Sequence, residues 1–300
     1  MTPPVVSVVI PTYNHANFLK AAIESVLNQT FSDWETVVVN NYSEDDTVEV
    51  VSSFKDPRIH LINFNNYGVI AASRNKGIGL SKGKFIAFLD SDDTWYPQKL
   101  DHCLNLLQSG WNAVCHGEFW IKNGVVLRKA FYGPQSRTTY PSLLFEGNCL
   151  STSAIIVEKS SVERVGGFSE DPSMVTAEDY ALWLSLAKSG CRFAILDEIL
   201  GEYRIHGGNQ SKGITRNLLA ELSVLEKSFS NITSQNLKTR LKMNRRIALA
   251  YYRGAREMQT EENYFGSLGL IFKSWLKFPF LLRQYIAAGL GFIGWLKHRE

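Results

Sequence analysis

The chain has 300 residues, of which 45% are hydrophobic, so it can bury the core of one large or two modest domains. Its net charge of +3 hides an asymmetry: from Lys238 onward there are 12 Lys and Arg against 4 Asp and Glu, and the remainder is acidic. Such a basic tail suits an anionic membrane surface or nucleic acid. Four cysteines without metal-ligand spacing, and no basic apolar leader before the first predicted strand, favour reduced thiols in a cytoplasmic protein.

The first hundred residues alternate between apolar runs and helical patterns. The pattern predicts strands over residues 5–10, 34–39, 59–64 and 84–89, and helices over 17–27, 48–54, 68–80 and 97–107. This alternation predicts an α/β fold, a Rossmann-like and mostly parallel sheet with helices on both faces. Ligands of such sheets bind at the carboxyl ends of the strands. The glycine-rich motifs of dinucleotide sites and P-loops are missing, which argues against both.

The strand predicted over residues 84–89 runs directly into Asp90, Ser91, Asp92 and Asp93. In an extended segment residues i and i+2 point the same way, so Asp90 and Asp92 are expected to face one ligand. Two carboxylates at the end of a strand can hold a hard divalent cation, which in turn bridges phosphate oxygens. The alternative is that these acids only cap the helix that follows.

The second half predicts further strands over residues 113–120, 124–129, 153–157, 192–196 and 200–205, and a helix over 176–188. Thr176 and Asp179 resemble a capping box at the start of that helix. A carboxylate there is stabilised by the helix dipole whether or not it does chemistry, and the dipole is expected to lower the pKa of Asp179.

Residues 214–300 are predicted to be a helical, basic and amphipathic region that follows a domain over residues 1–213, itself made of halves 1–100 and 101–213. Residues 264–296 are apolar but interrupted by Pro279 and three cations, Lys273, Lys277 and Arg283. The longest uncharged stretch, 284–296, is too short for the ~20 residues of a bilayer span. Helices lying in a membrane interface are favoured, with a packed helical cap or a dimer interface as alternatives.

Four motifs occur in a characteristic order: residues 6–14 from Val6 to Asn14, Asn66-Tyr67-Gly68 with Arg74-Asn75, Leu89 to Asp93, and residues 177–183 from Ala177 to Trp183. Together they resemble the family 2 inverting glycosyltransferases, which have the A-type nucleotide-sugar-transferase fold. The resemblance covers about residues 5 to 211 and leaves the tail uncovered.

The resemblance implies a role for each matched position. Asp179 would be the catalytic base, beside Glu178 as the other member of an acidic pair. The nucleotide-sugar would be bound by Pro11, Thr12, Tyr13, Asn41, Arg74, Asp90 and Ser91. Mg²⁺ or Mn²⁺ would be bound by Asp92, Asp90 and His206. A surface ion pair for Arg74 and a structural role for His206 stay open as alternatives.

One pair of residues departs from the family pattern: Asn40-Asn41 occupies the place where relatives commonly carry an acidic pair. A carboxylate accepts the imide N–H of uracil, whereas an asparagine offers both a donor and an acceptor. Asn41 is able to accept that bond through its carbonyl oxygen, or to suit another base edge.

The sequence therefore predicts a metal-dependent, inverting transfer of a sugar from a nucleotide diphosphate, with UDP favoured, to a saccharide or lipid-linked saccharide in cell-envelope polysaccharide synthesis. The expected location is peripheral, on the cytoplasmic face of the inner membrane. The membrane surface is an expected partner, nucleic acid is not, and a homodimer stays open. Two rival functions are a nucleotidyltransferase, which usually needs a glycine-rich phosphate loop, and a non-catalytic scaffold, which would have lost some of its acids.

Overall fold

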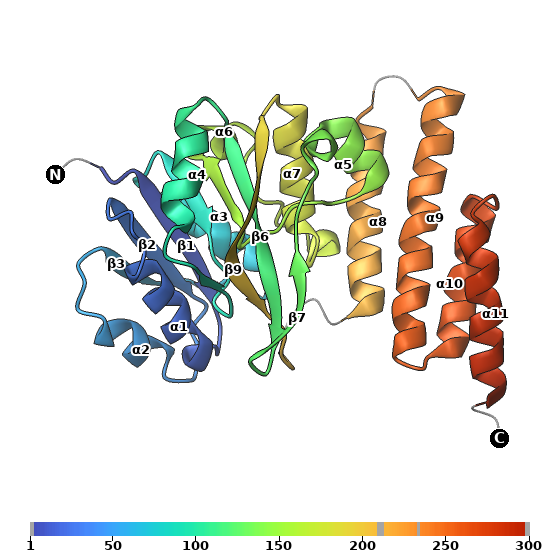
Figure 1. The fold of residues 1–300 in the computed structure, drawn as a ribbon, viewed down its shortest axis with the longest axis horizontal. Helices are drawn as coiled ribbons and strands as arrows, with labels where there is room; N and C mark the ends of the chain where they lie inside the picture. The colour runs from blue at the N-terminus through green and yellow to red at the C-terminus, as the bar shows by residue number, and fades with distance from the viewer. Residues whose placement is uncertain (1–2, 209–212, 233–234, 298–300) are drawn as a thin grey trace. The chain divides into compact units, whose positions relative to one another are not determined.

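The computed structural model describes residues 3–208, 213–232 and 235–297 and divides into two compact units. The sheet unit comprises residues 1–143, 148–172 and 178–209. The helical unit comprises residues 144–147, 173–177 and 210–300. Figure 1 shows the α/β architecture of the first and the helices of the second.

The first half of the sheet unit is a parallel sheet with crossover helices, as its sequence predicts. Strands β1 (Val6–Thr12), β2 (Trp34–Asn40), β3 (Ile59–Asn63) and β4 (Phe85–Phe88) lie in the order β3-β2-β1-β4. The helices between them are α1 (Ala16–Leu27), α2 (Thr47–Ser53) and α3 (Ile70–Leu80). Because these strands are parallel, their carboxyl ends meet at one edge of the sheet.

The second half makes the sheet mixed rather than mostly parallel. Strand β8 (Ile155–Glu158) lies antiparallel between β4 and β6 (Ala113–Lys122). Strand β6 pairs in parallel with β9 (Phe193–Arg204) and antiparallel with β7 (Val125–Ala130), and β9 pairs antiparallel with the short β5 (Thr94–Trp95). The two strands predicted over residues 192–205 are one strand, because register shifts let its pairing with β6 continue across residues 197–198. The remaining helices are α4 (Lys99–Gln108), α5 (Tyr140–Glu146), α6 (Lys159–Arg164) and α7 (Glu178–Lys188), with 3₁₀ turns at Gln135–Thr138 and Pro172–Met174.

Alternate residues of the buried strands supply two cores, one on each face of the sheet. Val8 of β1 packs in a cluster with Leu19 of α1 and Leu104 of α4. Val9, the next residue, faces α3, where a Cβ added at Gly77 would lie 2.4 Å from the Val9 Cγ1 atom. A glycine is therefore required for α3 to approach the sheet this closely. Helices cover both faces, as predicted.

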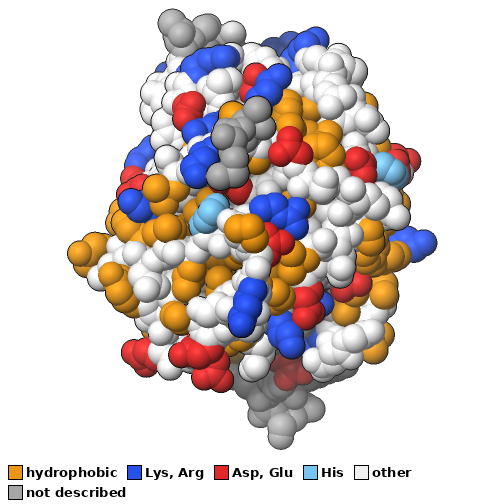
Figure 2. Space-filling model, turned by 90° about the vertical axis from the view of Figure 1, so that its left-hand side faces the viewer, with side chains coloured by type: hydrophobic (Ala, Val, Ile, Leu, Met, Phe, Trp, Pro, Cys, Tyr) orange, Lys and Arg blue, Asp and Glu red, His pale blue; other side chains and the backbone are white. Residues whose placement is uncertain are grey.

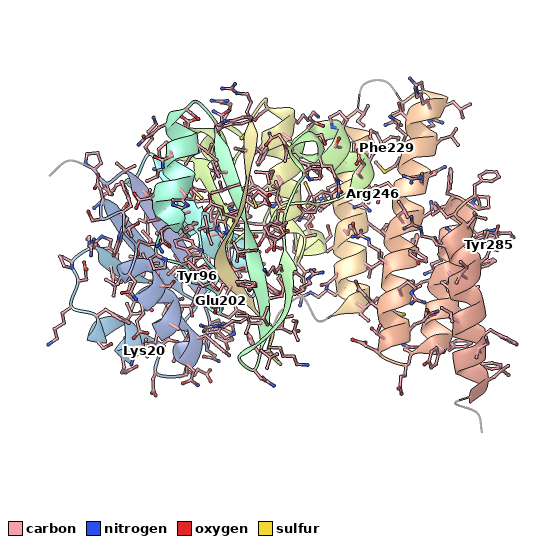
Figure 3. All side chains as sticks on the ribbon, in the orientation of Figure 1. Lys20, Tyr96, Glu202, Phe229, Arg246 and Tyr285 are labelled. Atoms are coloured by element: carbon pink, nitrogen blue, oxygen red, sulfur yellow. The ribbon has the colours of Figure 1, made fainter. Side chains whose placement is uncertain are left out.

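Polar contacts and surface charges complete the sheet unit. The hydroxyl of Tyr96, just after β5, donates to Glu202 Oε1 on β9 at 3.2 Å (Figure 3). On the face drawn in Figure 2, acidic and basic side chains are interspersed among apolar ones. The four cysteines are free and buried, in agreement with their predicted reduced state.

The helical unit contains α8 (Ile214–Ser230), α9 (Leu237–Thr260), α10 (Tyr264–Lys277) and α11 (Leu282–Lys297). Ala255, Ile271 and Ala287, from three of these helices, form a small core. Buried polar contacts add to it: Ser274 Oγ donates to the Ala248 carbonyl at 2.6 Å, and Arg246 of α9 pairs with Glu221 of α8 (Figure 3). None of the described helices has the length and apolar character to cross a membrane.

Candidate active site

The acidic motif lies in a turn and not in an extended segment. Strand β4 ends at Phe88, and the backbone N–H of Asp93 donates to the Asp90 carbonyl at 3.0 Å. The side chains of Asp90 and Asp92 therefore find different partners, Arg74 and His206. The two acids thus do not lie in an extended segment as expected, because the chain turns at Asp90, two residues after β4 ends; a ligand shared by both stays a prediction.

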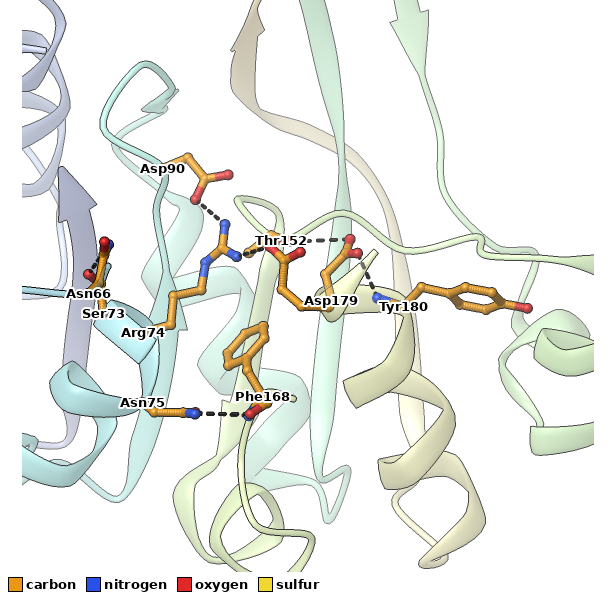
Figure 4. Close-up of polar contacts among 10 residues, drawn as sticks. Asn66, Ser73, Arg74, Asn75, Asp90, Thr152, Phe168, Asp179 and Tyr180 are labelled. Atoms are coloured by element: carbon orange, nitrogen blue, oxygen red, sulfur yellow. Dashed lines mark hydrogen bonds and ion pairs between the residues drawn. The ribbon is translucent and has the colours of Figure 1, made fainter. Parts of the chain in front are cut away.

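Arg74 joins two carboxylates from distant parts of the chain (Figure 4). Its guanidinium lies 2.7 Å from Asp90 Oδ1 and 2.6 Å from Glu178 Oε1, and its side chain is only 4% exposed. Burial disfavours the cation, but Asp90 and Glu178 outweigh burial and raise the pKa of Arg74. Arg74 is thus a buried clamp and not a surface ion pair, and Glu178 is held in that clamp beside Asp179.

Asp179 lies at the start of α7 with its carboxylate largely enclosed. The N–H of Tyr180 donates to Asp179 Oδ1 at 2.6 Å, and Thr152 Oγ1 lies 3.4 Å from Oδ2 (Figure 4). Burial, with the neighbouring Glu178 carboxylate, raises the pKa of Asp179 to about 7. The prediction that the helix dipole lowers this pKa is wrong, because a dipole contributes at most ~2 kcal/mol and burial outweighs it here.

The capping box predicted from Thr176 and Asp179 does not set the start of this helix. Helix α7 begins at Glu178, and Thr176 has a φ of +86°, outside helical geometry. Asp179 is therefore in the first turn, at the second helical position, where its Oδ1 accepts the bond from the next residue.

Asp92 and His206 form a second pair beside the Arg74 clamp. His206 Nε2 lies 2.9 Å from Asp92 Oδ2, and the His206 ring stacks on Phe18 at a centroid distance of 4.4 Å. Burial and the nearby Asp90 raise the pKa of Asp92. His15 adds a second imidazole, whose ring centroid lies 5.6 Å from that of His206.

These residues fit a divalent cation in part. Adjacent ligands of an octahedral cation with bonds of ~2.1 Å lie roughly 3 Å apart, which matches the Asp92–His206 separation of 2.9 Å. The predicted third ligand, Asp90, has one oxygen bound to Arg74. Within residues 3–208, 213–232 and 235–297, no three His, Cys, Asp or Glu side chains are placed to hold a metal ion together. A cation held by Asp92 and His206 would therefore need further ligands, such as the oxygens of a bound phosphate.

The third acid of the motif is a structural residue. Asp93 is buried, accepts a bond from Ser153 Oγ at 2.5 Å and another from the Arg204 N–H at 2.9 Å. Ser153 Oγ is also the acceptor for the N–H of Asp90, at 3.1 Å. Ser153 therefore fixes the acidic turn, and nothing in the sequence signals this because it lies about sixty residues further along the chain.

The predicted nucleotide residues gather at the carboxyl edge of the sheet. Pro11 and Thr12 end β1 and are buried, and Tyr13 follows with half of its side chain exposed. Asn41 Oδ1 accepts the backbone N–H of Asn66 at 2.9 Å. The amide oxygen of Asn41 thus orders the neighbouring loop with one of its two lone pairs, so both the second lone pair and the NH₂ group can serve a base edge.

Ser91 is the remaining predicted donor-binding residue, and it is buried. Its Oγ lies 2.9 Å from His15 Nδ1, which connects the acidic turn to the start of α1. His15 and Phe18 are site residues that the sequence interpretation missed. His15 ends the polar turn after β1 and Phe18 lies in the first turn of α1, and their types alone do not indicate a ligand site.

A family model for glycosyl transferase family 2 matches residues 7–165, more than half of the chain. The chain is a family 2 glycosyltransferase. This transferase is 34% identical over 222 residues to the E. coli UDP-Glc:alpha-D-GlcNAc-diphosphoundecaprenol beta-1,3-glucosyltransferase WfgD, which covers 73% of this chain and 85% of the relative. It is 30% identical over 206 residues to the Bacillus subtilis teichuronic acid biosynthesis glycosyltransferase TuaG, described as putative, covering 67% of this chain and 79% of the relative.

Solved structures confirm the predicted fold of the transferase. S. aureus TarS 1-349 in complex with UDP-GlcNAc superimposes with a TM-score of 0.69 at 16% identity, covering 91% of this chain and 81% of that one. Pyrobaculum calidifontis mannosyltransferase PcManGT, in complex with GDP-Man and Mn²⁺, gives a TM-score of 0.61 at 14% identity, covering 96% and 84%. The predicted family, fold class and glycosyl-transferring activity are thereby confirmed.

Proposed function

We propose that this transferase moves a sugar from a UDP-sugar to a lipid-linked saccharide during cell-envelope polysaccharide synthesis, with inversion at the anomeric carbon. The observation that carries the proposal is Asp179, a partly buried carboxylate with a pKa raised to about 7 beside the Arg74 clamp in a family 2 chain. The relatives WfaP and WfgD bear names that specify UDP-Glc and a diphosphoundecaprenol-linked acceptor, and TuaG is named for teichuronic acid.

Asp179 acts as the general base. A base with a pKa near the working pH is ionised often enough to act and still takes a proton well in the transition state. It removes the proton of an acceptor hydroxyl while that oxygen forms a bond to the anomeric carbon. The bond from that carbon to the diphosphate breaks on the opposite face, and the leaving group keeps its electron pair. Glu178 positions Asp179 through the Arg74 clamp, and a neutral Glu178 would leave Arg74 with one carboxylate.

Asp92 and His206 would hold Mg²⁺ or Mn²⁺ together with the donor diphosphate, and the cation would stabilise the negative charge that builds on the leaving group. The distance of 2.9 Å between Asp92 Oδ2 and His206 Nε2 supports these two residues as the cation ligands. Burial and, after it, the nearby Asp90 raise the pKa of Asp92, and a bound cation would favour the charged carboxylate.

At the base pocket, Asn41 would donate from its NH₂ group to a carbonyl oxygen of the nucleobase. Its Oδ1 accepts the N–H of Asn66 with one lone pair and would accept the imide N–H of uracil with the other. Tyr13 offers a half-exposed ring on which the base would stack. Both features suit uracil, whose carbonyl oxygens are acceptors, and support UDP as the donor nucleotide.

The helices α10 and α11 would hold the enzyme on the cytoplasmic face of the inner membrane. Their large exposed apolar residues include Phe265, Phe272, Leu276, Leu282, Ile286 and Phe292, and Phe280 is exposed in the turn between the two helices. Lys273, Lys277 and Arg283 lie among them, and apolar groups with flanking cations are typical of interfacial helices. A homodimer through the same surface would instead give a larger particle in detergent-free solution.

The test is a donor screen. UDP-, dTDP-, GDP- and CMP-linked sugars are incubated with the enzyme, with and without Mn²⁺, and release of the nucleotide is measured. We expect UDP-sugars to be cleaved slowly in a cation-dependent way and faster when a lipid-linked acceptor is added. Formation of a nucleotide-sugar and diphosphate from a sugar phosphate and UTP would instead identify a nucleotidyltransferase. Nucleotide binding without any turnover would favour the scaffold.

A further inference from the structure

The hairpin formed by β6 and β7 exposes a continuous apolar and basic segment. Residues 122–129 are all exposed, and among them Val125, Val126 and Leu127 are 62%, 50% and 55% exposed. Three consecutive exposed apolar residues are unusual on a surface that only meets water. The chain turns at Asn123 and Gly124, whose φ values of +50° and +77° are those of a tight two-residue hairpin.

The charges within the sequence of this hairpin have one sign. Between Glu118 and Glu146 the sequence has no acidic residue, and it has four basic ones: Lys122, Arg128, Lys129 and Arg137. The Arg128 guanidinium lies 3.5 Å from the centroid of the Trp120 ring, which holds the cation at the surface. Aromatic rings, cations and apolar side chains in one exposed segment are the composition of membrane-interface elements.

The hairpin stands at the same edge of the sheet as the candidate active site. Strand β6 is antiparallel to β8, and β8 is antiparallel to β4, so β6 and β4 run the same way and end at the same edge. Ile205, the neighbour of His206, donates its N–H to the Ile121 carbonyl at 2.8 Å. Figure 1 shows the β6–β7 turn beside the end of β9. The base of the hairpin is thereby joined to the segment that carries His206.

We propose that the β6–β7 hairpin is a membrane-docking element of the sheet unit, which inserts Val125, Val126 and Leu127 among anionic lipid headgroups beside the active site. The inference rests on the lipid-linked acceptor proposed above, and it adds a surface distinct from α10 and α11. A headgroup surface at this edge would bring the saccharide of a lipid-linked acceptor to the carboxyl edge of the sheet, where Asp179 takes its proton.

An anionic bilayer fits this surface better than a second copy of the chain. Strand β7 has only β6 as its neighbour, so its outer edge is open to pairing in principle. A register shift leaves Leu127 without a partner in the β6 ladder, and bulges and edge cations are devices that oppose edge-to-edge pairing. Two copies would also bring like charges together, whereas each cation near an anionic bilayer strengthens binding about fivefold.

The experiment uses the full chain with one reporter thiol, which is practical because the four native cysteines are buried. Val125→Cys is labelled with an environment-sensitive fluorophore, and Leu80→Cys is the matched control. Leu80 is 39% exposed and ends α3 just before β4 begins, at the opposite edge of the sheet. Each protein is mixed with phosphatidylcholine vesicles that contain or lack phosphatidylglycerol.

We expect the Val125 label to brighten and shift to the blue on the anionic vesicles, while the Leu80 label does not change. Lys122→Glu should weaken the vesicle affinity reported at Val125 on the order of tenfold, whereas Lys82→Glu, an exposed lysine at the opposite edge, should change it less than about twofold. No change at Val125 overturns the proposal, as does an equal change at both labels. A change at Val125 without vesicles that grows with protein concentration would identify a second copy as the occupant and also overturn it.

The same proteins are assayed for cleavage of UDP-sugars, so that the two proposals fail separately. Vesicle contact at Val125 without any sugar transfer leaves the docking element standing and removes the proposed function. Transfer to a lipid-linked acceptor without a signal at Val125 supports the proposed function and removes the docking element.

Discussion

Replacing Asp179 with asparagine should make the enzyme inactive and more stable at the same time. The pKa of about 7 lies roughly three units above the ordinary value of an aspartate, and one unit is worth ~1.4 kcal/mol. Ionising Asp179 in the folded protein therefore costs on the order of 4 kcal/mol more than in the unfolded chain. Asparagine keeps the oxygen that accepts the Tyr180 N–H and removes the charge.

The sign of the pH effect follows from the raised pKa. Between about pH 4 and pH 7 the folded protein holds a proton on Asp179 that the unfolded chain releases, so this group lowers stability as the pH rises and its effect is complete above pH 7. The stabilisation by Asp179→Asn should thus be small near pH 4 and reach a few kcal/mol near pH 8. Turnover should fall by at least ~10²-fold with donor affinity nearly unchanged, because the proton is taken in the transition state.

Chemical denaturation at acidic and alkaline pH measures the change in stability, and transfer assays measure the loss of turnover. Asp197→Asn is the matched control, since Asp197 is an exposed acid of β9 whose replacement should change stability by less than about 0.5 kcal/mol. A variant that is less stable than wild type near pH 8 would refute the assignment of a partly buried, destabilising carboxylate. Near-normal turnover would show that Asp179 is not the base.

Other predictions concern the neighbouring groups. Wild-type transfer should rise with pH through about 7 as Asp179 ionises, and a rate that is flat from pH 5 to 9 would contradict that. Glu178→Gln should destabilise the fold by ~1–3 kcal/mol, as thermal unfolding would show, because Arg74 keeps only Asp90 as a carboxylate partner, and its loss of turnover should be smaller than that of Asp179→Asn. Asp92→Asn should abolish the Mn²⁺ dependence of UDP binding in isothermal titration while the circular dichroism spectrum stays the same; unchanged affinity would remove Asp92 from the cation site. Asn41→Ala should weaken UDP binding by ~1–2 kcal/mol, and equal binding by the variant would leave Asn41 as a loop residue only.

The sequence predicted the parts of the fold that depend on local pattern. Buried strands such as β1 and the crossover helices between β1 and β4 follow from apolar runs and helical spacing, and the carboxyl edge of the sheet follows from their direction. The antiparallel position of β8 between β4 and β6 was not predictable in this way, because no local signal records which strands become neighbours.

In the candidate active site, too, the sequence predicted local features but not contacts between distant residues. The motifs identified Asp90, Asp92 and Asp179, but the partners that decide their chemistry are distant in sequence. Arg74 reaches one carboxylate 16 residues away and another 104 residues away, and only the folded chain reveals that it is buried between them. The pKa of Asp179 was misjudged for the same reason: helix position is readable from sequence, whereas the burial that outweighs it is not.

The Arg74 clamp restricts how this enzyme can be recombined with its relatives. The family match ends at residue 165, whereas Glu178 lies beyond it, so a fragment cut at the end of the match would contain the guanidinium without one of its carboxylates. A chimera that takes its first hundred residues from another transferase must carry an arginine at position 74, or its acidic pair at 178–179 will lose its anchor. Crossover points between residues 74 and 178 are therefore the ones at which donor-binding and catalytic segments from different parents are least interchangeable.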